Sequence, residues 1–506
     1  MQKMDYFILA IDQGTTNTKA ILVDAAGQVA ARASVALRVT YPQPSWVEQD
    51  ALAIWQSVQQ CIDTVLASGE AQMGAPGRTP AALGISNQRE SVVLWDRTTG
   101  EPLAPCVIWQ CQRGHRLIET LKGQGLEADV HSRTGLTLDP MFSASKMRWL
   151  LDNVPGARRR ADQGEVCLGT IDSWLIFKLT GGRVHACDMT NAARTLLFNL
   201  YTLDWDGEML CLFGIPRQAL PVVSPSTGVI GHTAAGGALP AGIPIAASIG
   251  DSHGALVGHA GFSPGAVKAT YGTGSSVMTP IATPILSQRG LSTTIAWSRP
   301  GQATYALEGN IYATGATIQW LGKLFGWEDA AARVTELAAT CPDSEGVYLA
   351  PAFVGLGAPW WNARARGMIH GLTLGSGAPQ LARAALESTA YQINDIFAAV
   401  QEEAGILLTT LHADGGASAN PLLMQFQADL VQCPVRVSVS TDVSALGAAY
   451  LAGLGVGVWK STEELAGLQR GEQLYTPTMP AAQRSARLAG WRDTLARVLQ
   501  GSAEPS

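Results

Sequence analysis

Residues 12–19 read Asp-Gln-Gly-Thr-Thr-Asn-Thr-Lys and follow directly on the apolar run at residues 6–11. A second, mostly apolar run covers residues 19–23 (KAILV) and is followed by the turn Asp-Ala-Ala-Gly at residues 24–27. Two short apolar runs joined by a glycine-containing turn are typical of a buried β-hairpin. This stretch therefore predicts the first two strands of a sheet.

The turn of this hairpin carries groups that suit a nucleotide. Gly14 lets the backbone approach a phosphate closely, and Thr15 and Thr16 supply hydroxyl and N–H donors. Lys19 supplies positive charge, and Asp12, at the end of the first run, is suited to hold Mg²⁺ through its water ligands. Taken alone, the same residues are equally well explained as a hairpin turn with an Asp cap.

A related unit recurs past the midpoint of the chain. Residues 266–271 form an apolar run, a Gly-Thr-Gly-Ser-Ser turn follows at residues 272–276, and the run resumes at Val277. Two such units indicate two related halves, each with a turn that faces phosphate. We place the domain boundary near residue 257 and expect domains at residues 1–257 and 258–506.

Helix-like and strand-like segments alternate along the chain. Residues 82–86 and 91–95 have extended patterns, whereas residues 51–67, 114–121 and 481–499 have helical ones. This alternation predicts a mixed α/β fold.

The composition excludes several classes of protein. With 47% hydrophobic residues, 15% charged residues and a net charge of −6, the chain is globular and has no basic footprint for nucleic acid. No run of about 18 apolar residues occurs, so membrane insertion is not expected. The eight cysteines are scattered, without metal-ligand spacing. Reduced thiols and a cytoplasmic location are therefore expected.

Three further motifs carry chemical groups. Asp251 follows an apolar run and precedes an expected helix, so it is either an N-cap or a reactive carboxylate. Arg89 and Glu90 could both reach one polyhydroxylated ligand if they lie in a turn, and Trp109 offers an apolar face for a carbon backbone. Without a ligand, Arg89 and Glu90 would form a surface ion pair and Trp109 would be a core tryptophan.

Asn420 follows an Asp-Gly-Gly-Ala turn at residues 414–417 and either contacts an adenine edge or caps the next helix.

Over essentially its full length, the chain resembles the FGGY carbohydrate kinases, and within them the branch that phosphorylates glycerol. The matching segments are DQGTTNTK (12–19), YPQPSWVEQD (41–50), GISNQRE (84–90), VIWQCQR (107–113), GTIDSWLIFKLTGG (169–182), TNAARTLLFN (190–199), YGTG (271–274), YALEGNIYATGATIQWL (305–321), PAFVGLGAPWWNARARG (351–367), DGGASANPLLMQFQADL (414–430) and ALGAAYLAG (445–453). The resemblance implies two duplicated ribonuclease-H-like domains, as in actin and hexokinase. ATP and a small polyol would meet in the interdomain cleft.

The resemblance also implies roles for individual residues. Asp251 would be the general base that accepts the proton of the attacking hydroxyl. Arg89, Glu90 and Trp109 would contact the polyol in the first domain. The ATP-binding residues that the resemblance implies are Thr15, Thr16, Lys19, Thr273, Gly315, Gln319, Gly416 and Asn420. These residues and Mg²⁺ at Asp12 are the parts that phosphoryl transfer needs.

Two polyol-contacting positions depart from the family's pattern. Met141 occupies a place where Tyr is usual, and Ser252 follows Asp251 where Gln is usual. Both changes remove a hydrogen-bonding group or shorten its reach. Glycerol is therefore the first expectation for the acceptor, and a four- or five-carbon polyol or a ketose is the alternative.

Other readings stay open at this stage. A non-catalytic or slowly hydrolysing ATP-binding protein could have the same fold. Such a protein would not need Asp251. A homo-oligomer, either a dimer or a tetramer, is compatible with the sequence. The glycine-rich loop at residues 232–244 contains no Arg or Lys. In bacterial relatives this loop carries an Arg and binds fructose 1,6-bisphosphate, so we expect no such regulation.

Overall fold

The computed structural model describes residues 6–73 and 79–502. The strands of the first sheet are, in spatial order, β13 (Thr227–His232), β14 (Pro244–Gly250), β5 (Ala82–Asn87), β1 (Phe7–Gln13), β2 (Asn17–Asp24) and β3 (Val29–Ala36). β1 and β2 form the predicted hairpin, with Asp12 opposite Lys19. β1 and β5 are almost entirely buried, which explains their continuous apolar sequences.

The strands of the second sheet are, in spatial order, β17 (Ser292–Arg299), β18 (Gln302–Ile311), β16 (Ser275–Ile281), β15 (Ala266–Tyr271), β21 (Thr410–Asp414), β22 (Val435–Ser438) and β23 (Glu472–Tyr475). β15 pairs antiparallel with β16 and parallel with β21, just as β1 pairs with β2 and β5. The order β3-β2-β1-β5-β14 thus recurs as β18-β16-β15-β21-β22. This repeat confirms the duplicated α/β fold.

A lateral lobe is inserted into the first half. Its small sheet has the order β4 (Glu48–Gln49), β7 (Cys106–Val107), β6 (Val92–Asp96) and β8 (Val166–Thr170). The first half also contains the helices α1 (Ala51–Met73), α2 (His115–Gly123), α3 (Glu127–Thr134), α4 (Ser143–Asn153), α5 (Ala157–Asp162), α6 (Ile171–Leu179) and α8 (Gly207–Phe213). The predicted helices at 51–67 and 114–121 correspond to α1 and α2.

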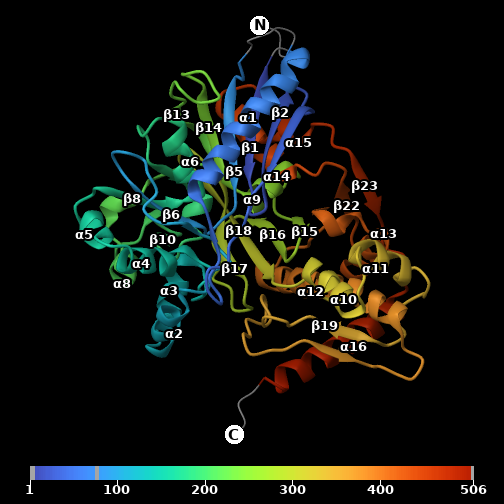
Figure 1. The fold of residues 1–506 in the computed structure, drawn as a ribbon. Coiled ribbons are helices and arrows are strands. Elements are labelled where there is room, and N and C mark those ends of the chain that lie inside the picture. Colours follow the sequence, from blue (N-terminus) through green and yellow to red (C-terminus); the bar gives the residue numbers. More distant parts are fainter. Residues whose placement is uncertain (1–5, 74–78, 503–506) are drawn as a thin grey trace.

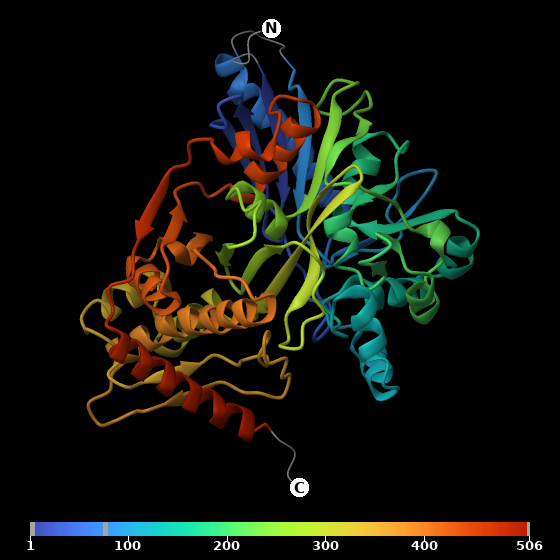
Figure 2. The ribbon, with the colours of Figure 1, turned by 180° about the vertical axis from the view of Figure 1, so that it is seen from behind.

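The second half contains the helices α10 (Gly315–Phe325), α11 (Ala330–Ala338), α12 (Ala378–Ala404), α13 (Pro421–Val431) and α16 (Ala481–Gln500). Figures 1 and 2 show the blue strands of the first sheet at the top and α12 and α16 at the bottom. Within the described ranges, no helix combines the length and the apolar character that crossing a membrane requires.

Two helices join the halves. α9 (Asp251–Gly258) follows the first sheet and contacts β15 and β16 of the second, whereas α14 (Val443–Gly455) follows β22 and packs on β1, β5 and β14 of the first. The two helices also pack against each other, between the sheets (Figure 1). A Cβ added to Gly447 would lie 1.9 Å from the Gly254 carbonyl oxygen. The backbones are therefore in direct contact at this pair of glycines.

We predict that Gly447→Ala lowers the free energy of unfolding by about 1–3 kcal/mol, because the added methyl group forces α14 away from α9. Urea unfolding measures this change. Gly123→Ala in α2 is the matched control, since a Cβ there meets nothing within 4 Å. Equal effects of the two substitutions would contradict the proposed close contact.

Candidate active site

The carboxyl ends of β1, β5 and β14 lie side by side in the first sheet. Gln13 is in register with Asn87, and Asn87 with Gly250. The residues next to these positions include Asp12, Arg89 and Asp251. Three segments that are far apart in the sequence thus meet at the sheet edge where ligands bind in open α/β sheets.

Asp251 is the first residue of α9, and Gly250 is its N-cap, so the capping alternative does not describe Asp251 itself. Its Oδ1 accepts a hydrogen bond from the Ser252 backbone N–H at 2.6 Å and lies 3.2 Å from Arg89 Nε. The side chain is 40% exposed and so can be reached by a ligand. Although part of the side chain is exposed, the surrounding protein partly desolvates the carboxylate, which raises the pKa of Asp251, and the Arg89 guanidinium opposes that rise.

Asp12 lies close enough to Asp251 for the two carboxylates to repel each other. Burial, and then the charge of Asp251, raise the pKa of Asp12 to about 6, while Ser86 donates a hydrogen bond to its Oδ1 at 3.0 Å. The charge of Lys19 opposes this rise, although its Nζ makes its direct contacts with Asp442 Oδ1 at 3.1 Å and the Thr441 carbonyl at 3.0 Å. Two partly buried carboxylates of this kind suit a divalent cation.

Arg89 and Glu90 lie in the turn after β5, as required for both to face one site, and Glu90 has a positive φ of 59°. They belong to a buried group of alternating charges rather than to a surface ion pair. Arg89 Nη1 contacts Glu308 Oε1 at 2.7 Å, and Arg194 contacts Glu90 at 2.6 Å and Glu308 Oε2 at 2.5 Å. Glu308 comes from β18, so this group connects the first half to the second sheet.

The buried charges depend on one another. Burial alone would raise the pKa of Glu308, but Arg194 and Arg89 hold it well below its usual value. Both Glu308 and Arg194 have no exposed surface. Removing one member of such a group leaves an uncompensated buried charge, which typically costs about 3–5 kcal/mol.

Ser252 contacts residues of the second sheet. Its Oγ lies 2.7 Å from Ser276 Oγ and accepts a hydrogen bond from Lys268 Nζ at 2.5 Å. Ser276 in turn donates to Glu308 Oε1 at 2.8 Å. The Ser252 hydroxyl, with its residue only 7% exposed, is therefore already engaged by protein groups.

Trp109 and Met141 differ in their connection to the site. The Trp109 indole N–H donates to Thr15 Oγ1 at 3.0 Å and thereby links the expected polyol region to the first phosphate loop. Met141 is buried in the core of the first half, and Lys146 donates a hydrogen bond to its carbonyl oxygen. Among the described residues, no polar contact joins Met141 to the charged group.

The second Gly-Thr turn, at residues 272–276, is built against α10. Thr314 Oγ1 and the Gly315 N–H both donate to the Gly272 carbonyl at 2.9 Å, and the Ala316 N–H donates to the Thr273 carbonyl at 3.0 Å. Gly315 and Thr273 therefore lie together, as expected for two residues that contact one nucleotide.

The remaining nucleotide-type residues lie beside this turn or on nearby helices. A Cβ on Gly415 would lie 2.6 Å from the Tyr271 carbonyl, so the loop that leads to Gly416 adjoins the second turn. Asn420 caps α13 through Leu423 N at 3.1 Å and donates to Thr335 at 2.8 Å, in agreement with the capping alternative. Gln319 is exposed on α10.

Sequence reasoning missed four residues of the site: Arg194, Lys268, Ser276 and Glu308. Arg194 and Glu308 occur in two of the matching segments, but no role was assigned to them. A charged residue inside an otherwise apolar strand, such as Lys268 in β15, was the available signal.

The glycine-rich loop has no cation of its own, yet a cation lies beside it. Residues 233–239 line a cavity of about 190 Å³ together with Trp55, Gln59 and Lys178. Lys178 comes from α6, more than 50 residues before the loop in the sequence. The expected lack of fructose 1,6-bisphosphate control stays a prediction.

Comparison with known proteins agrees with this arrangement. Residues 7–258 match the N-terminal domain, and residues 267–456 the C-terminal domain, of the FGGY family of carbohydrate kinases. A glycerol kinase of Stenotrophomonas maltophilia is 47% identical over 97% of this chain and 98% of its own length. The crystal structure of Plasmodium falciparum glycerol kinase with ADP superposes with a TM-score of 0.91 at 32% identity, covering 98% of each chain. Gluconate kinase from Lactobacillus acidophilus, at 22% identity and a TM-score of 0.87 with 99% of each chain covered, shares the fold.

We predict that Asp12→Asn stabilises the metal-free protein at pH 8 by about 1–3 kcal/mol, because it removes a carboxylate whose pKa is raised on folding. A raised carboxyl pKa costs stability as the pH increases from about 4 to 6, so the gain must be smaller at pH 4.5. Urea unfolding without Mg²⁺ measures both values. Asp63→Asn on the exposed face of α1 is the control, and a pH-independent gain at Asp12 would refute this account.

Proposed function

Because the chain belongs to the FGGY family of carbohydrate kinases, we propose that it transfers the γ-phosphoryl group of ATP to a primary hydroxyl of glycerol. Membership makes the protein a phosphotransferase that acts on an alcohol. The observation that carries the proposal is the position of Asp251: a reachable carboxylate beside Arg89, at the strand ends where the two halves meet.

Asp251 acts as the general base in this proposal. Among the described residues, both of its polar contacts fall on Oδ1, which leaves Oδ2 for the proton of the attacking hydroxyl. Arg89 fixes the carboxylate, and Glu308 fixes Arg89 at 2.7 Å. Trp109 offers its ring to the carbon backbone of the polyol, and Glu90 offers a carboxylate to a hydroxyl. Positioning of this kind accounts for much of the catalysis in phosphoryl transfer.

ATP would lie between the first and second phosphate turns. Thr15 and Thr16 from the first turn and Thr273 from the second supply donors, while Gly315 and Gly416 let the backbone approach the nucleotide. Mg²⁺, when bound, neutralises charge on the phosphate oxygens. Asp12 is the residue that would hold it, because a cation there relieves the repulsion from Asp251 that helps to raise the pKa of Asp12.

We also propose that the chain divides at residues 257 and 258 into a domain with the polyol site and the first phosphate loop and a domain with the nucleotide site. The duplicated sheets support this division. The crossing of α14 onto the first sheet means that the two domains share one core at their junction. The cytoplasmic location and the homo-oligomeric state stay predictions.

A longer polyol or a ketose is a second candidate acceptor. The observation that favours it is the engagement of Ser252 by Lys268 and Ser276, together with the apolar Met141. Both positions then offer few hydrogen bonds to a three-carbon ligand, and such hydrogen bonds carry much of the discrimination between small hydroxylated substrates.

Asp251→Asn tests the general base. We expect kcat to fall by about 10²–10⁴-fold, because the amide keeps the shape but cannot accept the proton. ATP affinity should be unchanged in the same variant. Asp12→Asn is the comparison variant, and its main effect should be a higher Mg²⁺ requirement. An Asp251→Asn variant that retains more than about a tenth of the wild-type kcat would exclude Asp251 from this role.

The acceptor is identified by a coupled assay of ADP formation with glycerol, dihydroxyacetone, erythritol, threitol, xylitol and common pentuloses. We expect the highest kcat/KM with glycerol. A higher value with a four- or five-carbon acceptor would replace glycerol by the second candidate, and ADP formation that is independent of any acceptor would contradict the kinase itself.

The Met141→Tyr variant, measured in the same acceptor assay, tests whether a hydroxyl at this position increases the preference for glycerol. The substitution adds this hydroxyl without disturbing the contact between Lys268 and Ser252. One additional hydrogen bond to a neutral hydroxyl would change the preference for glycerol by about 2- to 10-fold. Ser252→Gln is less suitable, since it would leave the buried Lys268 ammonium without this partner.

A further inference from the structure

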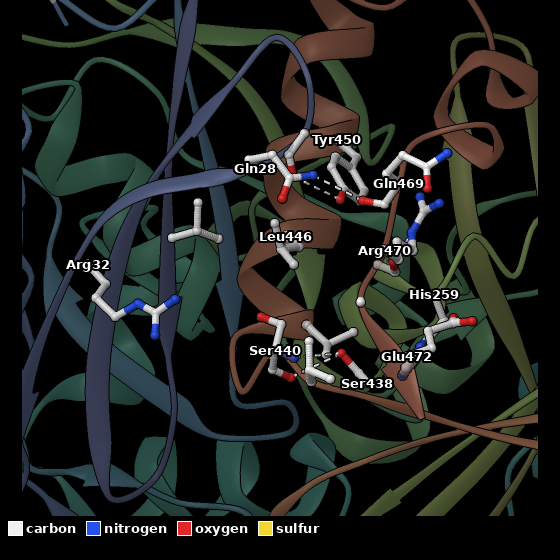
Figure 3. A pocket seen from close by; sticks show the side chains of 16 residues that line it. Gln28, Arg32, His259, Ser438, Ser440, Leu446, Tyr450, Gln469, Arg470 and Glu472 are labelled. Atoms are coloured by element: carbon white, nitrogen blue, oxygen red, sulfur yellow. Dashed lines mark hydrogen bonds between the residues drawn. The ribbon is translucent and has the colours of Figure 1, made fainter. Parts of the chain in front are cut away.

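A cavity of about 230 Å³ lies outside the candidate active site, between β3, α14 and β23. Figure 3 shows the side chains that line it, with His259 and Glu472 next to each other and Arg32 on the opposite side. His259 is the residue after α9, and Glu472 begins β23. Neither residue has a part in the proposed phosphoryl transfer.

A third side chain, which does not itself line the cavity, completes a cluster of metal-ligand type with His259 and Glu472. His412 lies in β21, which is separated from β23 by β22 in the sheet. One nitrogen or oxygen atom from each of His259, His412 and Glu472 lies within 4.8 Å of the others. The two imidazole rings have centroids 5.4 Å apart. Small side-chain movements would bring three such atoms to one ion at about 2.0–2.2 Å.

His412 lacks a partner for one of its ring nitrogens. Nδ1 is shut off from solvent and has no hydrogen-bond partner in the described part of the chain, and its distance of 3.8 Å to Glu472 Oε1 is too long for a hydrogen bond. A neutral imidazole has one nitrogen with a lone pair to offer. A cation held by both atoms would satisfy this unpaired nitrogen and the carboxylate oxygen that it faces.

The other two residues are prepared in ways that suit a ligand. His259 Nε2 lies 2.8 Å from Asp414 Oδ2, and a carboxylate on one ring nitrogen orients a metal-binding histidine and makes its other nitrogen more basic. Glu472 contacts Arg436 through Oε2 at 3.0 Å, which leaves Oε1 on the side of His412.

We propose that His259, His412 and Glu472 form a binding site for a divalent transition metal of the zinc class. Two imidazoles and one carboxylate suit Zn²⁺ and Co²⁺ better than Mg²⁺, which prefers oxygen ligands. The cavity supplies space for a water as the remaining ligand. A bound ion would connect the end of α9, which begins with Asp251, to β21, which leads into the nucleotide-type loop at Asp414.

Two arginines near the proposed metal site carry positive charge, which disfavours a bound cation. One of them, Arg436, offers a test of the proposal. Arg470 is occupied by the carbonyl oxygens of Gly258, Leu465 and Leu468 at 2.7–3.0 Å. Arg436, in contrast, competes directly for the Glu472 carboxylate. Removing Arg436 should therefore strengthen metal binding, whereas removing Glu472 should weaken it, although both substitutions break the same ion pair.

The experiment is a Co²⁺ titration of the full chain in a Cys211→Ser background, which removes the exposed thiol. Visible absorption and equilibrium dialysis report binding without reference to activity. We expect one equivalent of Co²⁺ that Asp12→Asn does not remove and that Zn²⁺ displaces. Its affinity should be at least about tenfold lower in His412→Ala and Glu472→Gln and higher in Arg436→Gln. His232→Ala, at an exposed histidine elsewhere, should have no effect.

Either of two results would overturn the proposal: unchanged Co²⁺ affinity in His412→Ala and Glu472→Gln, or equal losses in Glu472→Gln and Arg436→Gln. The second result would assign these residues a purely structural role. Melting temperatures without metal establish that each variant is folded, and His412→Asn replaces His412→Ala if the alanine variant unfolds.

Discussion

Direct backbone contact between α9 and α14 is the constraint on which the other features depend. Gly254 and Gly447 allow the two helices to approach until a single methyl group no longer fits between them. Each helix begins in one half of the chain and packs against the sheet of the other. Because Asp251 is the first residue of α9, this packing fixes the proposed general base at the junction of the halves.

The buried charges at the junction follow from the same geometry. Arg89 and Arg194 come from the first half and meet Glu308 from the second sheet, where water is excluded. Charges in such surroundings must be paired, so their relative positions are fixed within narrow limits. The same pairing holds Arg89 against Asp251. The carboxylate that we propose as the general base is therefore held in place by residues of both halves.

Much of this arrangement could be predicted from the sequence. The continuous apolar runs before residues 12 and 272 identify β1 and β15, because strands buried on both faces need apolar side chains throughout. The sequence identifies Asp12 and Asp251 as candidate site residues because each follows such a run. It does not identify Glu308, since its partner Arg89 lies 219 residues away and no local pattern indicates the ion pair. The hydrogen bond from Lys268 to Ser252 could not be predicted either, because no local sequence pattern indicates it.

The central claim is that a carboxylate at this junction takes a proton from an alcohol during phosphoryl transfer. The pH dependence of kcat for the best acceptor, at saturating ATP and Mg²⁺, tests it most directly. Because burial raises the pKa of Asp251, the account predicts that kcat falls on the acid side, with an apparent pKa above the usual 3.8 of an aspartate. A kcat that stays constant down to about pH 4, with the protein still folded, would contradict the claim.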